Sequence, residues 1–316
     1  MKFRTEIKLE AQQQNKVDHK SKVLLLGSCF SESMGRKLSY YQFDTLINPF
    51  GTLFSPTAIA KVIEDTVVQK KHKASELVVH GDLFHSLHHH SDLSGSSPEV
   101  VLDHIHHAQQ SCFTQLTQAS HVMITLGSSW VYQYISKNQW VANCHKIPQS
   151  EFRKVDLTLA QIEEALVEMV THIRKINSSV QIIFTVSPVR HLKDGMIENS
   201  ISKAKLVTAV QLLRESHAVA YFGSYEIMMD DLRDYRFYEA DMVHPNSVAV
   251  DYIWDQFSRV WIDEKSQSYF KRIASLRKSK EHRPFQKHSI SHQFFLETLA
   301  KKQQELEQEL KIKFDA

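Results

Sequence analysis

The sequence has few cysteines, little net charge and no long apolar run, and each absence excludes a class of protein. Its 316 residues include three cysteines, at positions 29, 112 and 144, and no CxxC pair. An odd number of widely spaced cysteines argues against a disulfide framework. It favours free thiols in a reducing compartment, so we expect a cytoplasmic protein.

Charge and hydropathy exclude two further kinds of partner. The 38 basic and 36 acidic residues give a formal net charge of +2, which argues against an extended nucleic-acid interface. No apolar stretch approaches the roughly 20 residues of a membrane span. The first residues lack the apolar segment of a secretory signal. We therefore expect no nucleic-acid partner and no membrane partner, and the 42% of apolar residues suffices for a large core.

Short apolar strands alternate with amphipathic helices along most of the chain. Strands are predicted at 23–26, 121–126, 180–186 and 218–222. Helices are predicted at 31–41, from 56, 98–116, 159–176, 199–216 and from 247. Two hairpins are expected, one pairing 77–80 with 84–87 and one pairing 130–135 with 139–142. The alternation predicts an α/β fold, a three-layer α/β/α sandwich with a mainly parallel sheet.

Composition divides the chain into three parts. Residues 1–22 form a polar lead-in, 23–262 form the α/β domain, and 263–316 form a helical C-terminal extension rich in Lys, Glu and Gln. Within this extension, residues 303–313 are predicted to be an exposed helix. That helix is either a contact between copies in a homo-oligomer or a loosely held tail.

Two segments far apart in the chain carry residues suited to nucleophilic catalysis. Gly27 ends the first predicted strand and permits a tight turn, in which Ser28 and Cys29 precede a helix. Asp241 and His244, three residues apart, share a face on a tight loop. A carboxylate that fixes the tautomer of an imidazole makes it a better general base. The two segments predict a hydrolase or an acyltransferase.

The same segments carry a family resemblance. Gly27-Ser28-Cys29-Phe30 and Asp241-Met242-Val243-His244 resemble the SGNH/GDSL hydrolase pattern, within which the chain closely resembles the GSCFA family. The likeness extends in matching order over residues 20–260 and includes Asn48-Pro49-Phe50-Gly51-Thr52 and Ser202-Lys203-Ala204. It implies a flavodoxin-like sheet and an esterase or acyltransferase acting on an acylated small molecule or carbohydrate. We expect no cofactor and no metal.

The alignment of the GDSL motif with this sequence indicates which residue is the candidate nucleophile. GDSL enzymes use the serine at the third position of Gly-Asp-Ser, and counting from Gly27 places Cys29 there. A thiolate beside an imidazole is a strong nucleophile, so Cys29 is the favoured candidate. Two alternatives stay open. Either Ser28 attacks, or the site is a catalytically inactive binding or interaction module.

The resemblance also assigns groups that would stabilise an oxyanion or bind substrate. The family's glycine corresponds to Gly51, and Ser129 stands where the wider superfamily has an asparagine. Asn143 either takes over that donor role or is a turn residue, and His145 follows it in the same segment. Each lost oxyanion donor costs about a hundredfold in rate, so an active enzyme needs a replacement.

Arg190 has two interpretations. It follows the strand 180–186, so its planar guanidinium either faces the pocket and binds a carboxylate or phosphate, or joins a salt-bridge network. The network, with Arg233, Asp234 and Arg236, is the interpretation we favour.

The 19 histidines raise the hypothesis of a metal site, because His85, His88, His89 and His90 stand close to Asp92. Adjacent side chains diverge on both strands and helices, however. The segment 85–90 is therefore predicted to be a flexible polar loop.

Overall fold

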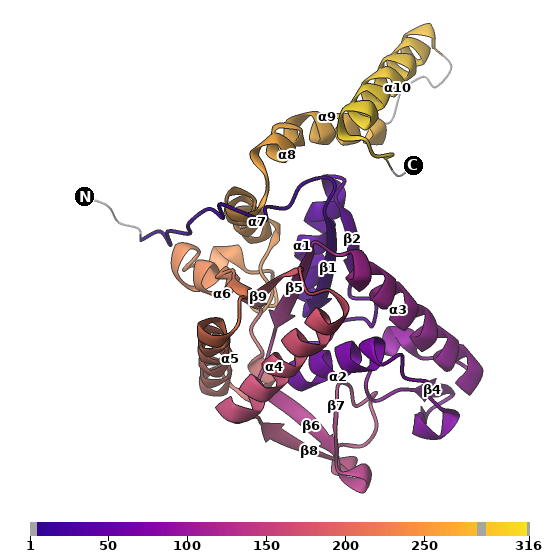
Figure 1. Ribbon diagram of the computed structural model, residues 1–316, viewed down its shortest axis with the longest axis vertical. Helices are drawn as coiled ribbons and strands as arrows, with labels where there is room; N and C mark the ends of the chain where they lie inside the picture. Colours follow the sequence, from indigo (N-terminus) through magenta and orange to yellow (C-terminus); the bar gives the residue numbers. More distant parts are fainter. Residues whose placement is uncertain (1–4, 283–288, 315–316) are drawn as a thin grey trace.

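The computed structural model describes residues 5–282 and 289–314 and is built around a five-stranded parallel sheet (Figure 1). The strand order is β10-β9-β5-β1-β2, the flavodoxin-like order, which confirms the predicted α/β fold. In that order the strands are β10 (Ala220–Tyr221), β9 (Gln181–Val186), β5 (His121–Leu126), β1 (Lys22–Gly27) and β2 (Asp44–Ile47).

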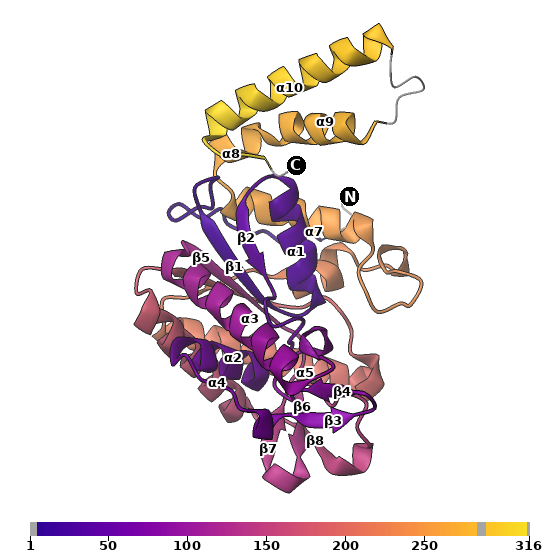
Figure 2. The ribbon, with the colours of Figure 1, turned by 90° about the vertical axis from the view of Figure 1, so that its right-hand side faces the viewer.

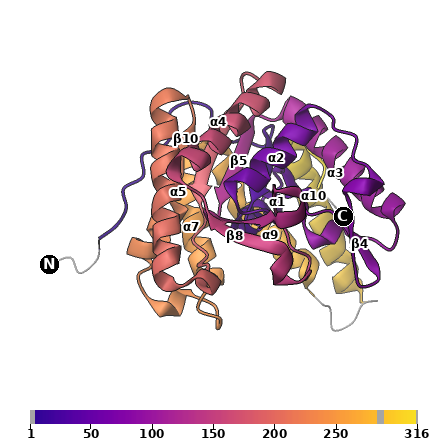
Figure 3. The same ribbon diagram turned by 90° about the horizontal axis from the view of Figure 1, so that it is seen from below.

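Helices cover both faces of this sheet (Figures 1 and 3). On one face lie α2 (Pro56–Val67), α3 (Pro98–Gln118), α4 (Leu159–Ile176) and α5 (Met196–Ser216). On the other lie α1 (Cys29–Tyr40), α7 (Ser247–Trp261) and the short α6 (Ser224–Glu226), which continues as a π-helical turn over Ile227–Asp231.

Two separate cores result from the alternation of side chains along each strand. Leu24 and Leu26 of β1 pack against α2 to α5, whereas Val23 and Leu25 pack with α1 and α7. Successive side chains of a strand point to opposite faces, so a run of apolar residues fills both cores at once. This explains why the strands are continuously apolar, and it confirms the three-layer sandwich.

Two small antiparallel sheets lie outside the sandwich. β6 (Trp130–Tyr134) pairs with β7 (Gln139–Val141), and β3 (Val78–His80) pairs with β4 (Leu83–His85), which confirms both predicted hairpins. A third strand, β8 (Phe152–Asp156), pairs with β6 and was not predicted. Its Phe-Arg-Lys-Val-Asp sequence is largely polar, so its apolar content is too low to mark a strand.

The segment before β1 packs against the end of α7. Val17 is buried, and its N–H donates to the carbonyl oxygen of Trp261 at 2.7 Å. After α8 (Glu264–Ser268), the helices α9 (Phe270–Glu281) and α10 (Ile290–Leu310) lie alongside one another beyond the sandwich (Figure 2). α10 begins thirteen residues before the helix predicted at 303–313. Within the described residues, no helix combines the length and apolar character needed to cross a bilayer.

Gly27 has no room for a side chain. Its φ is +135°, and an added Cβ would lie 2.2 Å from the carbonyl oxygen of Thr125 on β5. We expect Gly27→Ala to lower the free energy of unfolding by about 3 kcal/mol or more, because it combines strain with a backbone clash. Urea unfolding measures this.

Gly81→Ala is the matched control. Its φ is also positive, at +61°, but an added Cβ would meet nothing within 4 Å. We expect a cost of about 1 kcal/mol from the left-handed conformation alone. Equal costs for the two variants would show that the Gly27 contact with Thr125 does not matter.

Candidate functional site

The turn between β1 and α1 holds Ser28 in a structural position. Ser28 is only 2% exposed, and its N–H donates to the carbonyl oxygen of Thr125 at 3.1 Å. Its hydroxyl caps α1 by accepting the N–H of Phe30 at 3.3 Å. The helix therefore begins at Cys29, two residues earlier than predicted, and the Ser28 hydroxyl serves as its cap.

Cys29 is the more accessible member of the pair. It is the first residue of α1 and is half-buried, so its N–H belongs to the helix end that lacks intrahelical acceptors. Burial raises the pKa of the Cys29 thiol, as does the nearby charge of Glu32, while the charge of Lys203 lowers it. Burial also raises the pKa of Cys112 to about 12 and that of Cys144 to about 11.

Asp241 and His244 form a hydrogen-bonded pair, as their spacing suggests. His244 Nδ1–H donates to Asp241 Oδ2 at 2.7 Å. The other carboxylate oxygen accepts the N–H of Val243 at 2.8 Å and that of His244 at 3.0 Å. These bonds, first of all the backbone N–H of His244, lower the pKa of Asp241 to about 2. The imidazole is thus held in one tautomer, in which Nε2 can accept a proton.

The loop that carries this pair is tied to the end of β9. The N–H of Arg190 donates to the carbonyl oxygen of Val243 at 3.2 Å. The Arg190 guanidinium stacks on the ring of Tyr238 at 4.2 Å and lies 5.4 Å from that of Tyr235. In the described part of the chain Arg190 has no ion pair, so the favoured salt-bridge network was wrong for it. Aromatic stacking holds the guanidinium instead.

His191 follows β9 and is partly buried. Its ring packs 5.1 Å from that of Phe54, and its Nε2 would lie 3.2 Å from a Cβ placed on Gly127. Burial, first of all, together with the charges of Lys203 and His244, lowers the pKa of His191 to about 4. His191 is therefore electrostatically linked to both His244 and Lys203.

Lys203 is the residue at this edge that the sequence analysis left without a role. It is 1% exposed on α5, and its Nζ donates to the carbonyl oxygens of Gly127 at 2.8 Å and Ser187 at 2.7 Å. Burial lowers the pKa of Lys203 to about 7. Lys203 follows Asn199 by four residues and precedes Leu206 by three, which places all three on the buried face of α5. This helical spacing could have predicted from the sequence that Lys203 is buried.

The predicted oxyanion donors are largely engaged elsewhere. The N–H of Gly51 donates to the carbonyl oxygen of Asn48 at 2.8 Å. Ser129 is fully buried, and its hydroxyl donates to Asp156 at 2.6 Å. Asn143 accepts the N–H of His145 at 2.9 Å. An oxyanion role for Gly51 or Ser129 would require their present bonds to change, whereas the bond of Asn143 uses only its side-chain oxygen.

His145 belongs to the histidine-rich segment rather than to the turn after β1. Its Nε2–H donates to the carbonyl oxygen of Ser86 at 2.7 Å, and its ring stacks on His85 at 4.6 Å. His89 is 1% exposed and packs 5.7 Å from Phe50. Residues 86–90 lie in a loop, as predicted, but the imidazoles of His85 and His89 pack in the interior instead of facing solvent. No group of three potential metal ligands is arranged for an ion within residues 5–282 and 289–314.

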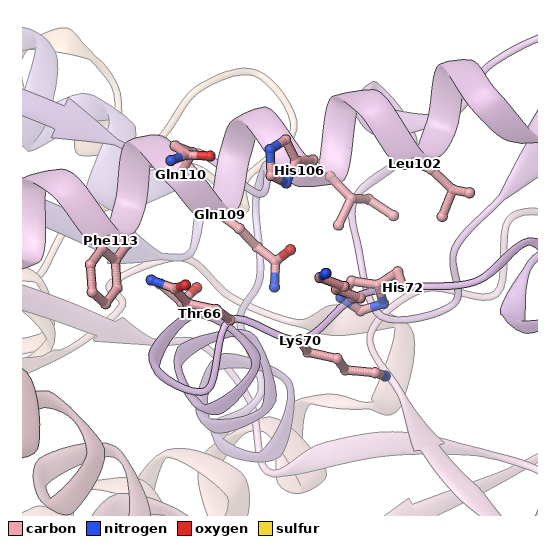
Figure 4. A pocket seen from close by; sticks show the side chains of 11 residues that line it. Thr66, Lys70, His72, Leu102, His106, Gln109, Gln110 and Phe113 are labelled. Carbon is pink, nitrogen blue, oxygen red and sulfur yellow. The ribbon is translucent and has the colours of Figure 1, made fainter.

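A separate cavity of about 370 Å³ lies between α2 and α3 (Figure 4). Gln109 points from α3 toward the end of α2, where its side-chain N–H donates to the carbonyl oxygen of Asp65 at 3.1 Å. His72 and Lys70 line the cavity from the segment that follows α2. The described residues that line it include none of the predicted site residues.

Comparison with known proteins identifies the family. A model described as the GSCFA family matches residues 22–257. The chain belongs to the GSCFA family. A model described as the GSCFA domain protein, C-terminal domain, matches residues 273–316, the part of this GSCFA protein that includes α10 and most of α9.

No curated protein matches the sequence. Among solved structures, a carbohydrate esterase family 3 from Talaromyces cellulolyticus is similar at 11% sequence identity with a TM-score of 0.36. That match covers 81% of this chain and 99% of the other.

The buried histidines predict how stability depends on pH. Burial lowers the pKa of His88, His145 and His191 to about 4 in each case. In the unfolded chain these groups titrate near pH 6.5, at about the ordinary pKa of histidine. Between pH 6.5 and 4 the unfolded state therefore binds more protons, so we expect the urea midpoint to fall from pH 7 to pH 5.

Two variants isolate the contribution of His191 to the pH dependence of stability. His191→Gln cannot take up a proton, so its stability should fall less than that of the wild type between pH 7 and pH 5. His104→Gln, at an exposed position on α3, should behave as the wild type does. Identical pH dependence in both variants would contradict the buried neutral state of His191.

Proposed function

We propose that this GSCFA protein is an SGNH-type acyl-transfer enzyme, most simply an ester hydrolase, that uses Cys29 as its nucleophile. The substrate is a small acylated molecule, such as an acylated carbohydrate. The observation that carries the proposal is the Asp241–His244 pair. Its 2.7 Å bond at Nδ1 leaves Nε2 to act as a base, on a loop bonded to the carboxyl edge of the sheet.

The geometry at the β1–α1 turn supports Cys29 over Ser28. The hydroxyl of Ser28 is buried and caps the helix, whereas Cys29 is half-buried at the first position of α1. A helix N-terminus favours an anionic group, and a thiolate there is more easily formed. The raised pKa of Cys29 means that the thiol is the resting form, so a base is needed.

The reaction then proceeds in two balanced steps. Cys29 Sγ gives its proton to His244 Nε2 and forms a bond to the acyl carbon, while the C–O bond breaks and the alcohol leaves with that proton. Water next gives a proton to His244 and attacks the thioester. The C–S bond breaks, and the thiol recovers its proton. Asp241 stabilises the imidazolium in both steps.

Two donors are suited to the oxyanion. The first is the N–H of Cys29, at the helix end where N–H groups lack intrahelical acceptors. The second is the side chain of Asn48, whose Oδ1 accepts the N–H of Gly27 at 2.9 Å, while none of the described residues accepts a hydrogen bond from its buried Nδ2. Asn48 lies beside the turn that presents Cys29, which makes it better placed than Ser129 or Asn143.

Turnover of p-nitrophenyl acetate tests this assignment. Cys29→Ala and His244→Ala should each lose at least about a hundredfold in kcat/KM, because nucleophile and base act together. Asp241→Asn should lose activity by releasing the tautomer of His244. His244→Ala with unchanged turnover would exclude this triad.

Two control variants separate the loss of a nucleophile from an effect on stability. Ser28→Ala should keep turnover but lose about 1 kcal/mol of stability with its helix cap, and Cys144→Ser should match the wild type. Iodoacetamide and a fluorophosphonate, followed by mapping of the labelled residue, distinguish Cys29 from Ser28. A protein that labels at neither residue and turns over no ester would instead be a non-catalytic binding module.

A further inference from the structure

Arg190 places a guanidinium without a carboxylate partner beside the loop that carries the proposed base. The guanidinium carbon lies 4.2 Å from the ring centre of Tyr238 and 5.4 Å from that of Tyr235. Aromatic rings cover the faces of a guanidinium, whereas its N–H groups point outward in its own plane. Stacking therefore fixes the position of the Arg190 side chain and leaves its N–H edge for an acceptor.

The carboxylates on the segment that carries both tyrosines are paired with other residues. Three of its aspartates form ion pairs within the segment: Asp241 with His244 at 2.7 Å, Asp234 with Arg236 at 3.4 Å, and Asp230 with Arg233. Glu239, which is exposed, forms no ion pair with Arg190. Over residues 5–282 and 289–314, then, no acidic side chain neutralises the Arg190 guanidinium, and an anion from outside the chain can do so.

A second polar group at the same place also lacks an acceptor. Tyr238 is only 7% exposed, and none of the described residues accepts a hydrogen bond from its hydroxyl. Burial raises the pKa of Tyr238, against the opposing charge of Arg190, so the hydroxyl keeps its proton. A buried donor without an acceptor is unfavourable. An acceptor bound beside Arg190 would therefore be stabilised by the hydroxyl as well as by the guanidinium.

Backbone contacts join these two groups to the loop of the proposed base. The N–H of Arg190 donates to the carbonyl oxygen of Val243 at 3.2 Å, and Tyr238 pairs with Pro245 in an antiparallel bridge. His244 stands between Val243 and Pro245 in the chain. A molecule whose reacting group lies at His244 therefore has Arg190 and Tyr238 as its neighbours.

We propose that Arg190 and Tyr238 bind an anionic group of the substrate, a carboxylate or a phosphate, next to the ester that Cys29 attacks. A guanidinium edge gives two parallel hydrogen bonds to two oxygens of such a group. The Tyr238 hydroxyl donates a further bond. The substrate is thus an acylated molecule that carries a negative charge. This substrate class rests on the proposed function, whereas binding of the anion does not depend on turnover.

Titration with inorganic phosphate or with acetate tests the anion site without turnover. At constant ionic strength, the amide ¹H–¹⁵N signals of the loop 235–245 should shift saturably with at least one of the two anions. Acetamide, which has the shape of acetate without its charge, should leave these signals in place. Absence of a saturable shift with both anions in the wild type would overturn the proposal, whether or not any variant folds.

Two variants and a matched control assign the binding to its residues. Arg190→Gln should weaken anion binding by about tenfold or more, because a charge-assisted bidentate contact is lost. Tyr238→Phe keeps the stacked ring and should weaken binding about threefold or more through loss of the donor. Arg236→Gln removes the same charge from an exposed arginine paired with Asp234, and its affinity should equal that of the wild type. A folded Arg190→Gln protein, verified by circular dichroism, with wild-type affinity would refute the assignment.

Three aryl acetates with the same acetyl group test the substrate class. They are 4-acetoxybenzoate, 4-acetoxyphenyl phosphate and the neutral 4-acetoxybenzamide, each normalised to its rate of hydrolysis by hydroxide. At least one anionic ester should exceed the neutral one in kcat/KM by about tenfold, and the better of the two identifies a carboxylate or a phosphate. Arg190→Gln should bring this ratio close to one, and Arg236→Gln should keep it. A ratio of one in the wild type would refute the anionic substrate.

Failure of this inference is distinguishable from failure of the proposed function. Saturable anion binding that depends on Arg190, without turnover of any ester, would retain the anion site and refute the hydrolase. Turnover that is lost in His244→Ala, with no anion binding and no preference for the charged esters, would retain the hydrolase and refute the roles of Arg190 and Tyr238.

Discussion

The close approach of Gly27 to Thr125 is the constraint on which the rest of the site depends. A Cβ at this position would overlap the Thr125 carbonyl oxygen, so only glycine lets β1 end this close to β5. The same turn donates the N–H of Ser28 to that oxygen, accepts the N–H of Leu53 at 3.0 Å, and is bonded to Asn48. The end of β1 thereby orients α1 and the loop after β2 together.

The residues of the proposed site differ in exposure. Lys203 is buried and Cys29 is half-buried, and burial disfavours the charged form of each. Asp241 and His244 are about half exposed, at 49% and 48% for their side chains, and solvent supports their charges. Forming a thiolate therefore requires charges that compensate for burial. The exposed pair can exchange protons with solvent.

The sequence predicted the parts of the molecule that depend on local pattern. Continuous apolar strands imply a sheet buried on both faces, and β1 contributes to both cores as that pattern requires. The Asp241–His244 bond follows from a spacing of three residues. β8 and the burial of His89 were missed, because a polar strand and a packed imidazole depend on neighbours distant in sequence.

The layered α/β fold and the Asp241–His244 pair follow from local pattern, because strand alternation, turn glycines and short-range spacing are local properties. Which polar residues are already engaged depends on how distant segments pack. Ser28 caps a helix, Ser129 donates to Asp156, and Lys203 bridges the ends of two strands. Each of these roles is fixed by hydrogen bonds that form only when the segments pack together, and residue type alone does not specify them.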